Sequence, residues 1–139
     1  MSRDAIAGKK PAKTAAKNNH NRRVGVWGEQ VAAEYLVKHG YEIMEKNVYT
    51  PYGEIDLVCK HTDMLIFVEV KTRTNTELGF PEAGLTRRKA THLVKACEEY
   101  LLQRPNLPTD WSLDLIAVIG KPGDTTPQVD HFENVANES

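Results

Sequence analysis

The chain lacks the features that would place it among membrane, secreted or zinc-binding proteins. No apolar run reaches the roughly 18 residues that a membrane-spanning helix needs, and no signal-peptide hydrophobic region is present. The two cysteines, Cys59 and Cys97, lie in apolar patterns with neither a CxxC arrangement nor the histidine spacing of a zinc site. We therefore expect a soluble, cytoplasmic protein with no membrane partner, in which both thiols are small buried hydrophobes.

What the chain does contain is an ordinary globular composition with an uneven distribution of charge. Its 139 residues, 40% hydrophobic and 27% charged, suffice for one domain with a core. Residues 1–23 carry seven Lys/Arg against Asp4 alone, whereas the remaining residues are acidic and bring the net charge to −1. We expect a disordered basic tail over residues 1–22 and a single domain over residues 23–139. Such a tail can contact polyanions or merely solubilise the chain, and both interpretations stay open.

Hydrophobic periodicity predicts an α/β domain. A helix is expected over residues 24–38, ended by Gly40, with Glu29 at the rim of its buried face. Thr86 can cap a second helix that runs to about residue 104, and residues 72–85 form a long loop before it. Strands are expected over residues 41–49, 53–59, 64–71 and 111–119, with a short edge strand within 128–135. This order predicts a mixed β-sheet with a helix on each face.

The strands over residues 53–59 and 64–71 carry charged residues where apolar ones are usual. If they form an antiparallel hairpin, one face pairs Cys59 with Ile66, Leu57 with Val68 and Ile55 with Val70. The other face pairs Glu54 with Lys71, Asp56 with Glu69 and Val58 with Phe67, and a one-residue slip would set apolar residues opposite charged ones. Because like charges directly opposite are destabilising, we expect Lys71 or a divalent cation between Asp56 and Glu69.

The two acids and the lysine suggest a specific chemistry. Carboxylate oxygens on one face, with open positions for water and substrate, suit Mg²⁺ or Mn²⁺. Such a cation polarises a phosphoryl oxygen, and a nearby lysine stabilises developing charge. Asp56, Glu69 and Lys71 supply these parts, with the Val70 carbonyl as a further ligand and Glu29 as a fourth acid. A salt-bridge ladder of Glu54, Lys71 and Glu69 on the sheet surface is the structural alternative.

Several motifs in order make the chain similar to a known family. They are Gly28-Glu29, Ala32-Ala33, Tyr35-Leu36 and Gly40-Tyr41, then GEIDLV at residues 53–58, FVEVKTR at residues 67–73, Lys89 and Leu113-Asp114. Over about residues 22–120 the chain resembles the bacterial YraN family, which is uncharacterised. That family looks like a member of the PD-(D/E)xK, restriction-endonuclease-like superfamily, close to archaeal Holliday-junction resolvases. Ile55 stands where the name of the motif has proline.

The resemblance implies a restriction-endonuclease-like fold and a role for each matching residue. Asp56 and Glu69 would be the motif's acids, Lys71 its lysine and Glu29 the helix-borne acid. Mg²⁺ or Mn²⁺ would be the cofactor, and phosphodiester hydrolysis the reaction. DNA, branched or otherwise structured, is the expected partner, and a homodimer that cuts both strands is compatible with this expectation.

Further basic residues were weighed as contacts to nucleic acid. Arg73, Arg87, Arg88 and Lys89 can form a phosphate-contacting rim, although Arg87 and Arg88 also suit an ordinary solvated helix start. Trp27 and Tyr35 are expected in the core, and no catalytic role is assigned to His39, His61 or His92. Asp114 is expected to be satisfied by a backbone or arginine partner. The alternative function is a non-catalytic nucleic-acid-binding or adaptor protein on the same fold, because tight duplex binding normally uses a broad positive surface that this acidic body lacks.

Overall fold

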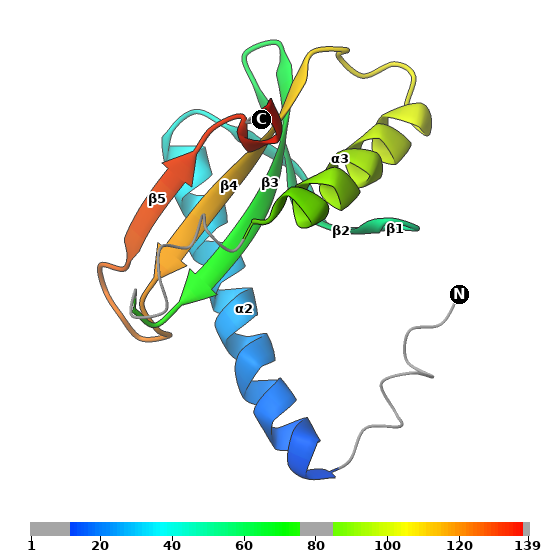
Figure 1. The fold of residues 1–139 in the computed structure, drawn as a ribbon. Helices are drawn as coiled ribbons and strands as arrows, with labels where there is room; N and C mark the ends of the chain where they lie inside the picture. The colour runs from blue at the N-terminus through cyan, green and yellow to red at the C-terminus, as the bar shows by residue number, and fades with distance from the viewer. Residues whose placement is uncertain (1–11, 76–84, 138–139) are drawn as a thin grey trace.

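The computed structural model describes residues 12–75 and 85–137 of the chain. A five-stranded sheet in the order β1-β2-β3-β4-β5 forms its centre. The strands are β1 (Glu42–Thr50), β2 (Gly53–His61), β3 (Met64–Arg73), β4 (Trp111–Ile119) and β5 (Gln128–Phe132). Only β3 and β4 pair in parallel, so the sheet is mixed. Helices α2 (Ala12–Lys38) and α3 (Arg87–Leu102) lie on opposite faces of the sheet, and a short 3₁₀-helix, η2 (Val135–Asn137), follows β5 (Figure 1). The predicted α/β architecture, compatible with a restriction-endonuclease-like fold, is confirmed.

Helix α2 is longer than the sequence pattern predicts. It begins at Ala12 rather than at residue 24, and its first turns project beyond the sheet (Figure 1). Residues 12–22, expected to be disordered, are therefore helical, whereas residues 1–11 lie outside the described residues. The physical reason is cooperativity, because adding a residue to an existing helix is far easier than nucleating one, and alanine and lysine favour the helix. Residues 19–23 of this helix are exposed, so no apolar stripe is needed there.

Two hydrophobic clusters separate the helices from the sheet. Leu57, Cys59, Ile66, Val68, Ile116 and Val118 pack under α2 with its Ala32, Ala33 and Leu36. On the other face Val58, Leu65, Phe67 and Leu113 pack under α3 with its Leu93, Ala96, Cys97 and Tyr100. Both cysteines are fully buried, as expected, and burial raises the pKa of the Cys59 thiol to about 12. None of the described helices is both long and apolar enough to cross a membrane.

Helix α2 approaches the sheet most closely where Gly28 lies over Thr72 at the end of β3. A Cβ atom on Gly28 would lie 1.9 Å from the Thr72 Oγ1 and 3.0 Å from its Cβ, so only glycine fits without displacement. Strand β3 continues to Arg73, two residues into the region that the sequence predicts as a loop. Residues 76–84 of that predicted loop lie outside the described residues. The contact at Gly28 positions α2, and with it Glu29, against the charged end of the hairpin.

The hairpin of β2 and β3 has the predicted register over most of its length. Cys59 pairs with Ile66, Val58 with Phe67 and Leu57 with Val68, but the ladder ends there. The expected pairs Ile55–Val70, Asp56–Glu69 and Glu54–Lys71 are therefore wrong as backbone pairs. Ile55 is also on the other face from the one predicted, because it packs in the cluster under α3 rather than with Leu57 and Cys59.

The second helix and the last strands agree closely with the prediction. The Thr86 side chain accepts a hydrogen bond from the Lys89 backbone N–H at 3.2 Å and caps α3. Strand β4 has the predicted bounds, and β5 is an edge strand that ends at Phe132. The N-terminal end of α3 consequently lies beside the C-terminal half of β3, where the candidate residues gather.

Candidate functional site

A bend in the β1–β2 hairpin builds the centre of the site. Asn47 in β1 has a left-handed backbone conformation (φ 52°). Strands β1 and β2 pair at Lys46–Leu57 and at Val48–Ile55, but Asn47 and Asp56, which lie between these two pairs, are not themselves paired. In place of a ladder bond, the Val70 backbone N–H donates to the Asp56 Oδ2 at 2.8 Å. The Asp56 side chain thus points across to β3 between the two faces. This bend is the reason that Ile55 changes face.

Asp56 and Glu69 meet through their side chains although they are not a backbone pair. Each carboxyl group shifts the pKa of the other, so the two side chains lie close together. Burial, and to a smaller extent the charge of Glu69, raises the pKa of Asp56 to about 8. The hydrogen bond from the Val70 N–H opposes this rise. Burial also raises the pKa of Glu69, and its interaction with Asp56 and the charge of Lys71 oppose that rise. The predicted juxtaposition of the two acids is present.

Two lysines lie beside the acids in an open groove. The Lys71 Nζ is 3.7 Å from the Glu69 Oε2, and the side chains are 26% and 18% exposed. Lys89 of α3 also lies close enough to lower the pKa of Glu69. The groove lies between α3 and the hairpin and is lined by Tyr52, Glu69, Lys71, Thr86, Arg88, Lys89, His92 and Leu93. The site is therefore accessible from solvent and carries positive charge on its α3 side.

Glu29 and Glu54 form a second pair of acids, bridged by an amide. The Asn47 Nδ2 donates to the Glu29 Oε1 at 2.9 Å and to the Glu54 Oε2 at 3.0 Å. Burial raises the pKa of Glu29, with smaller contributions from the charges of Asp56 and Glu54 and an opposing one from Asn47. Four acids consequently share one region, Glu29 entering it from α2 as predicted. The salt-bridge ladder is present only between Lys71 and Glu69, since Glu54 binds Asn47 instead.

The donor set suits a hard divalent cation. In the described part of the chain no three His, Cys, Asp or Glu side chains are gathered closely enough to hold a metal by themselves. Mg²⁺, however, is commonly bound through one or two carboxylates, with water and substrate phosphate completing its shell. Asp56 and Glu69 provide two such carboxylates, and a bound cation would compete with protons for them, since the pKa of each is raised. The residues present therefore fit Mg²⁺ or Mn²⁺.

The four basic residues predicted to contact nucleic acid are divided by the structure. Arg88 and Lys89 line the groove of the carboxylate pair. Arg87, the first residue of α3, is exposed and is not among the residues that line this groove. Arg73 lies in a different groove, between β3 and α2. The four residues therefore do not form a single rim, and Arg73 lies in a groove of its own.

Sequence reasoning missed several residues of this region. Glu54 was expected on the same face as Asp56, but as an ion-pair partner of Lys71 and not as a partner of Asn47. Asn47 carries no signal in the sequence, since its role depends on one left-handed backbone position. Tyr52, in the turn between β1 and β2, is 45% exposed at the mouth of the groove, which only the folded hairpin reveals.

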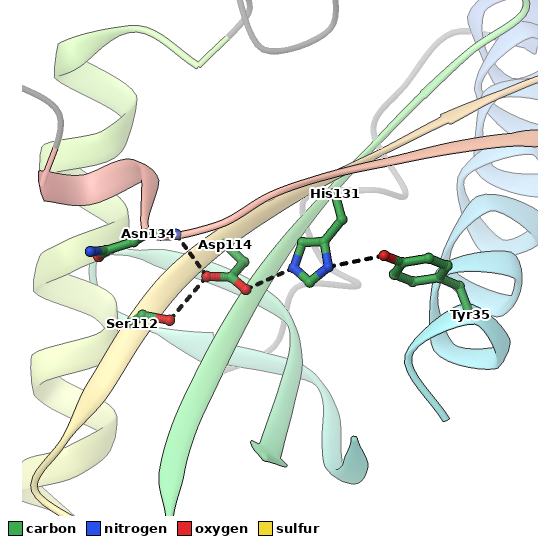
Figure 2. Close-up of polar contacts among 5 residues, drawn as sticks. All are labelled: Tyr35, Ser112, Asp114, His131 and Asn134. Carbon is green, nitrogen blue, oxygen red and sulfur yellow. Dashed lines mark hydrogen bonds and ion pairs between the residues drawn. The ribbon is translucent and has the colours of Figure 1, made fainter. Parts of the chain in front are cut away.

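Asp114 belongs to a separate buried network in which His131 was also missed. The His131 Nε2 lies 2.8 Å from the Asp114 Oδ2, and its Nδ1 lies 3.3 Å from the Tyr35 hydroxyl. Ser112 and the Asn134 backbone N–H both donate to the Asp114 Oδ1 at 3.0 Å. Figure 2 shows this chain of contacts running from β4 through β5 to α2. Asp114 is satisfied partly by backbone, as expected, but its side-chain partners are a serine and a histidine rather than an arginine.

Comparison with known proteins identifies relatives of the chain. The model of the uncharacterised protein family UPF0102 matches residues 28–118. A UPF0102 protein of Syntrophomonas wolfei is 44% identical over 114 residues, which cover 82% of this chain and 97% of the relative. A UPF0102 protein of Syntrophotalea carbinolica is 40% identical over 109 residues, covering 78% of this chain and 87% of the relative. The names of these relatives state no activity, so the chemistry must be argued from the site.

Proposed function

Because this chain belongs to the uncharacterised protein family UPF0102, as its resemblance to YraN predicts, we propose its function from its own site: a metal-dependent nuclease that hydrolyses phosphodiester bonds in DNA. The observation that carries the proposal is that Glu69, close to the more deeply placed Asp56, lines an open groove together with Lys71 and Lys89. Two acids forced together at a partly buried position cost stability. A purely structural role does not explain why the two acids are held together at this cost in stability, whereas a bound divalent cation would offset their repulsion.

Each residue has a distinct part in the proposed reaction. Asp56 and Glu69 would hold Mg²⁺ or Mn²⁺, which supplies polarisation of a phosphoryl oxygen and acidification of water when bound. Lys71 is placed to orient the attacking water or to stabilise the charge that develops on the phosphorane oxygens. Lys89 and Arg88 would hold the substrate phosphates from the side of α3. Glu29 would act on the cation or its water from the side of α2.

The groove favours a substrate with bases that are not fully stacked. Tyr52 presents an exposed ring at its mouth, and His92 lines the same groove from α3. Stacking on an aromatic side chain is worth about 1–3 kcal/mol per base and requires a base free of its own helix. Branched, forked or flapped DNA offers such bases next to a duplex. We therefore propose structured DNA in preference to a continuous duplex.

A cleavage assay tests the proposal. Labelled branched, flapped and linear DNA is incubated with Mg²⁺ or Mn²⁺ and the purified protein. Asp56→Asn, Glu69→Gln and Lys71→Met are each expected to lower the cleavage rate by roughly 10²-fold or more, the usual cost of removing one preorganised electrostatic group. Asp63→Asn is the matched control, because it makes the same substitution in the exposed turn at the other end of the hairpin. Equal rates for the wild type and Asp56→Asn on every substrate would contradict the proposal.

A non-catalytic nucleic-acid-binding or adaptor protein is the second candidate. It is favoured by the finding that no three metal-ligating side chains are gathered in the described part of the chain. Salt-dependent DNA binding that survives Asp56→Asn, without cleavage by the wild type under any metal condition, would support this function over the first. If removal of residues 1–22 abolishes that DNA binding, the basic segment is responsible for the binding.

A further inference from the structure

A second groove lies between α2 and the end of β3, apart from the groove of the carboxylate pair. Its walls are His20, Asn21, Val24 and Gly25 of α2 and residues 72–75 of the other segment, which include Arg73. It encloses about 370 Å³. Most of these residues are polar, and Arg73 brings a permanent positive charge.

Arg73, which lines this groove, has a donor without a partner among the described residues. Its Nε is buried and has no hydrogen-bond partner among the described residues. A buried donor without a partner is expensive, and a guanidinium cannot escape the cost by losing its proton. Its backbone is fixed by the hydrogen bond from the Gly120 N–H to the Arg73 carbonyl at 2.8 Å. A guanidinium with an N–H that has no partner is suited to bind an oxyanion through a charge-assisted hydrogen bond.

Gly25 supports the same conclusion from the opposite wall. A glycine inside a helix costs about 1 kcal/mol relative to alanine, so its presence calls for a reason. Packing does not provide one, because no atom lies within 4 Å of the position that a Cβ would take. Gly28, one turn later, differs, since Thr72 fills that space. The missing side chain at Gly25 instead leaves the groove open beside α2.

We propose that this groove binds a backbone phosphate of a nucleic acid, with Arg73 as its main contact. The proposal rests on the proposed function, because the same strand of DNA would supply the phosphodiester at Asp56 and Glu69. Arg73 follows Lys71 by two residues on β3, about 6.6 Å along the strand. In this proposal the nucleic-acid backbone crosses this end of the sheet from one groove to the other. Asn21 and His20 would add neutral contacts from α2.

Fluorescence anisotropy with labelled forked DNA, in EDTA so that no cleavage occurs, measures this contact. Arg73→Gln is expected to raise Kd roughly tenfold and to reduce the slope of log K against log salt by about 0.9. Gly25→Glu, whose new Cβ would have no protein atom within 4 Å, places a negative side chain at the groove and is expected to raise Kd at least as much. Lys60→Gln, at an exposed position of β2 that lines neither groove, is the control and should bind as the wild type does. Thermal melting establishes that each variant is folded.

Wild-type affinity in both Arg73→Gln and Gly25→Glu, or no DNA binding by the wild type, would overturn the proposal. A titration with inorganic phosphate, followed by the NMR signal of the Arg73 Nε–H, distinguishes a free anion from a backbone phosphate. If phosphate shifts that signal while Arg73→Gln leaves the DNA Kd unchanged, the groove is a free-anion site and the proposal is wrong. The affinity measured in EDTA does not depend on cleavage. The subsite can therefore fail while the nuclease proposal stands, and the nuclease proposal can fail while the Arg73 effect is present.

Discussion

Asp56 and Glu69 occupy positions where ordinary strands carry apolar residues, and the bend at Asp56 brings their carboxyl groups close together. The Val70 N–H fixes Asp56, and Lys71 sits at 3.7 Å from Glu69. Because its pKa is raised to about 8, Asp56 keeps a proton at neutral pH, and the pair exists without two adjacent negative charges. This proton makes the pair sensitive to pH and is replaceable by a cation.

Stability in EDTA should depend on pH through this pair. Unfolded Asp56 loses its proton near its usual pKa of 3.8, whereas the native residue keeps it to about pH 8. Between these values the native state binds more protons, so the pair's contribution to the free energy of unfolding is largest below pH 4 and falls as the pH rises to 8. Urea unfolding at a series of pH values should therefore show the wild type losing stability relative to Asp56→Asn across this window.

Asp63→Asn is the control for this measurement. It removes an exposed carboxylate from the turn of the same hairpin, so its stability should follow the wild type at every pH. A difference between the wild type and Asp56→Asn that stays constant from pH 4 to pH 8 would show that the carboxyl pair does not hold its proton in the native state.

Single residues differ in how far the sequence could predict them. The alternation of side chains in strands predicts Asp56, Glu69 and Lys71 on one face, but it does not predict that the ladder ends at Leu57 and that Asp56 reaches β3 through its side chain. Asn47 and His131 could not be found in this way. Asn47 acts through one left-handed backbone position, and His131 meets Asp114 only because β5 returns beside β4.

At the scale of the elements, the crossing of α2 over β3 controls where Glu29 lies. Gly28→Ala should destabilise the protein by roughly 1–3 kcal/mol, as overpacking does, because the new Cβ would lie 1.9 Å from the Thr72 Oγ1. Gly25→Ala is the matched substitution one turn earlier, with no atom within 4 Å. It should stabilise the helix by about 0.5–1 kcal/mol. Urea unfolding measures both changes.

The pair Gly28→Ala and Thr72→Ala distinguishes a local clash from a general loss of helix packing. Because Thr72→Ala removes the Oγ1, the double variant should regain part of the stability that Gly28→Ala loses. If the two single changes simply add, or if Gly28→Ala and Gly25→Ala have the same effect, the close contact between α2 and β3 does not exist in solution.

The elements themselves were largely predictable, and the exceptions have physical causes. Strand β4, the Thr86 cap and the register near the turn of the β2–β3 hairpin follow from alternation and capping. The early start of α2 did not follow, since residues 12–22 contain no apolar stripe in the sequence and residues 19–23 are exposed. The end of the ladder after Leu57 did not follow either, because a side chain of Asp56 replaces a backbone partner.

On the scale of the whole molecule, the sheet separates the two helices, and both helices contribute residues to the same end of the sheet. Helix α3 brings Arg88 and Lys89 to one groove, and α2 brings Glu29 to the acids and Gly25 to the other groove. The body of the protein carries a net negative charge, and Lys71, Arg88, Lys89 and Arg73 place positive charge on the walls of these two grooves. This arrangement suits a substrate held at a few phosphates and not across a broad surface.

Titration calorimetry with Mn²⁺ at pH 7, in buffers of different ionisation enthalpy, tests most directly whether the carboxyl pair is a cation site. The account predicts one site, with release of up to one proton per ion as the proton on the pair leaves. It also predicts loss of that site in Asp56→Asn and in Glu69→Gln but not in Asp63→Asn. At ten times Kd the bound ion should stabilise the wild type by about 1.4 kcal/mol. Mn²⁺ that does not bind, or that binds the wild type and Asp56→Asn alike without releasing protons, would contradict the account.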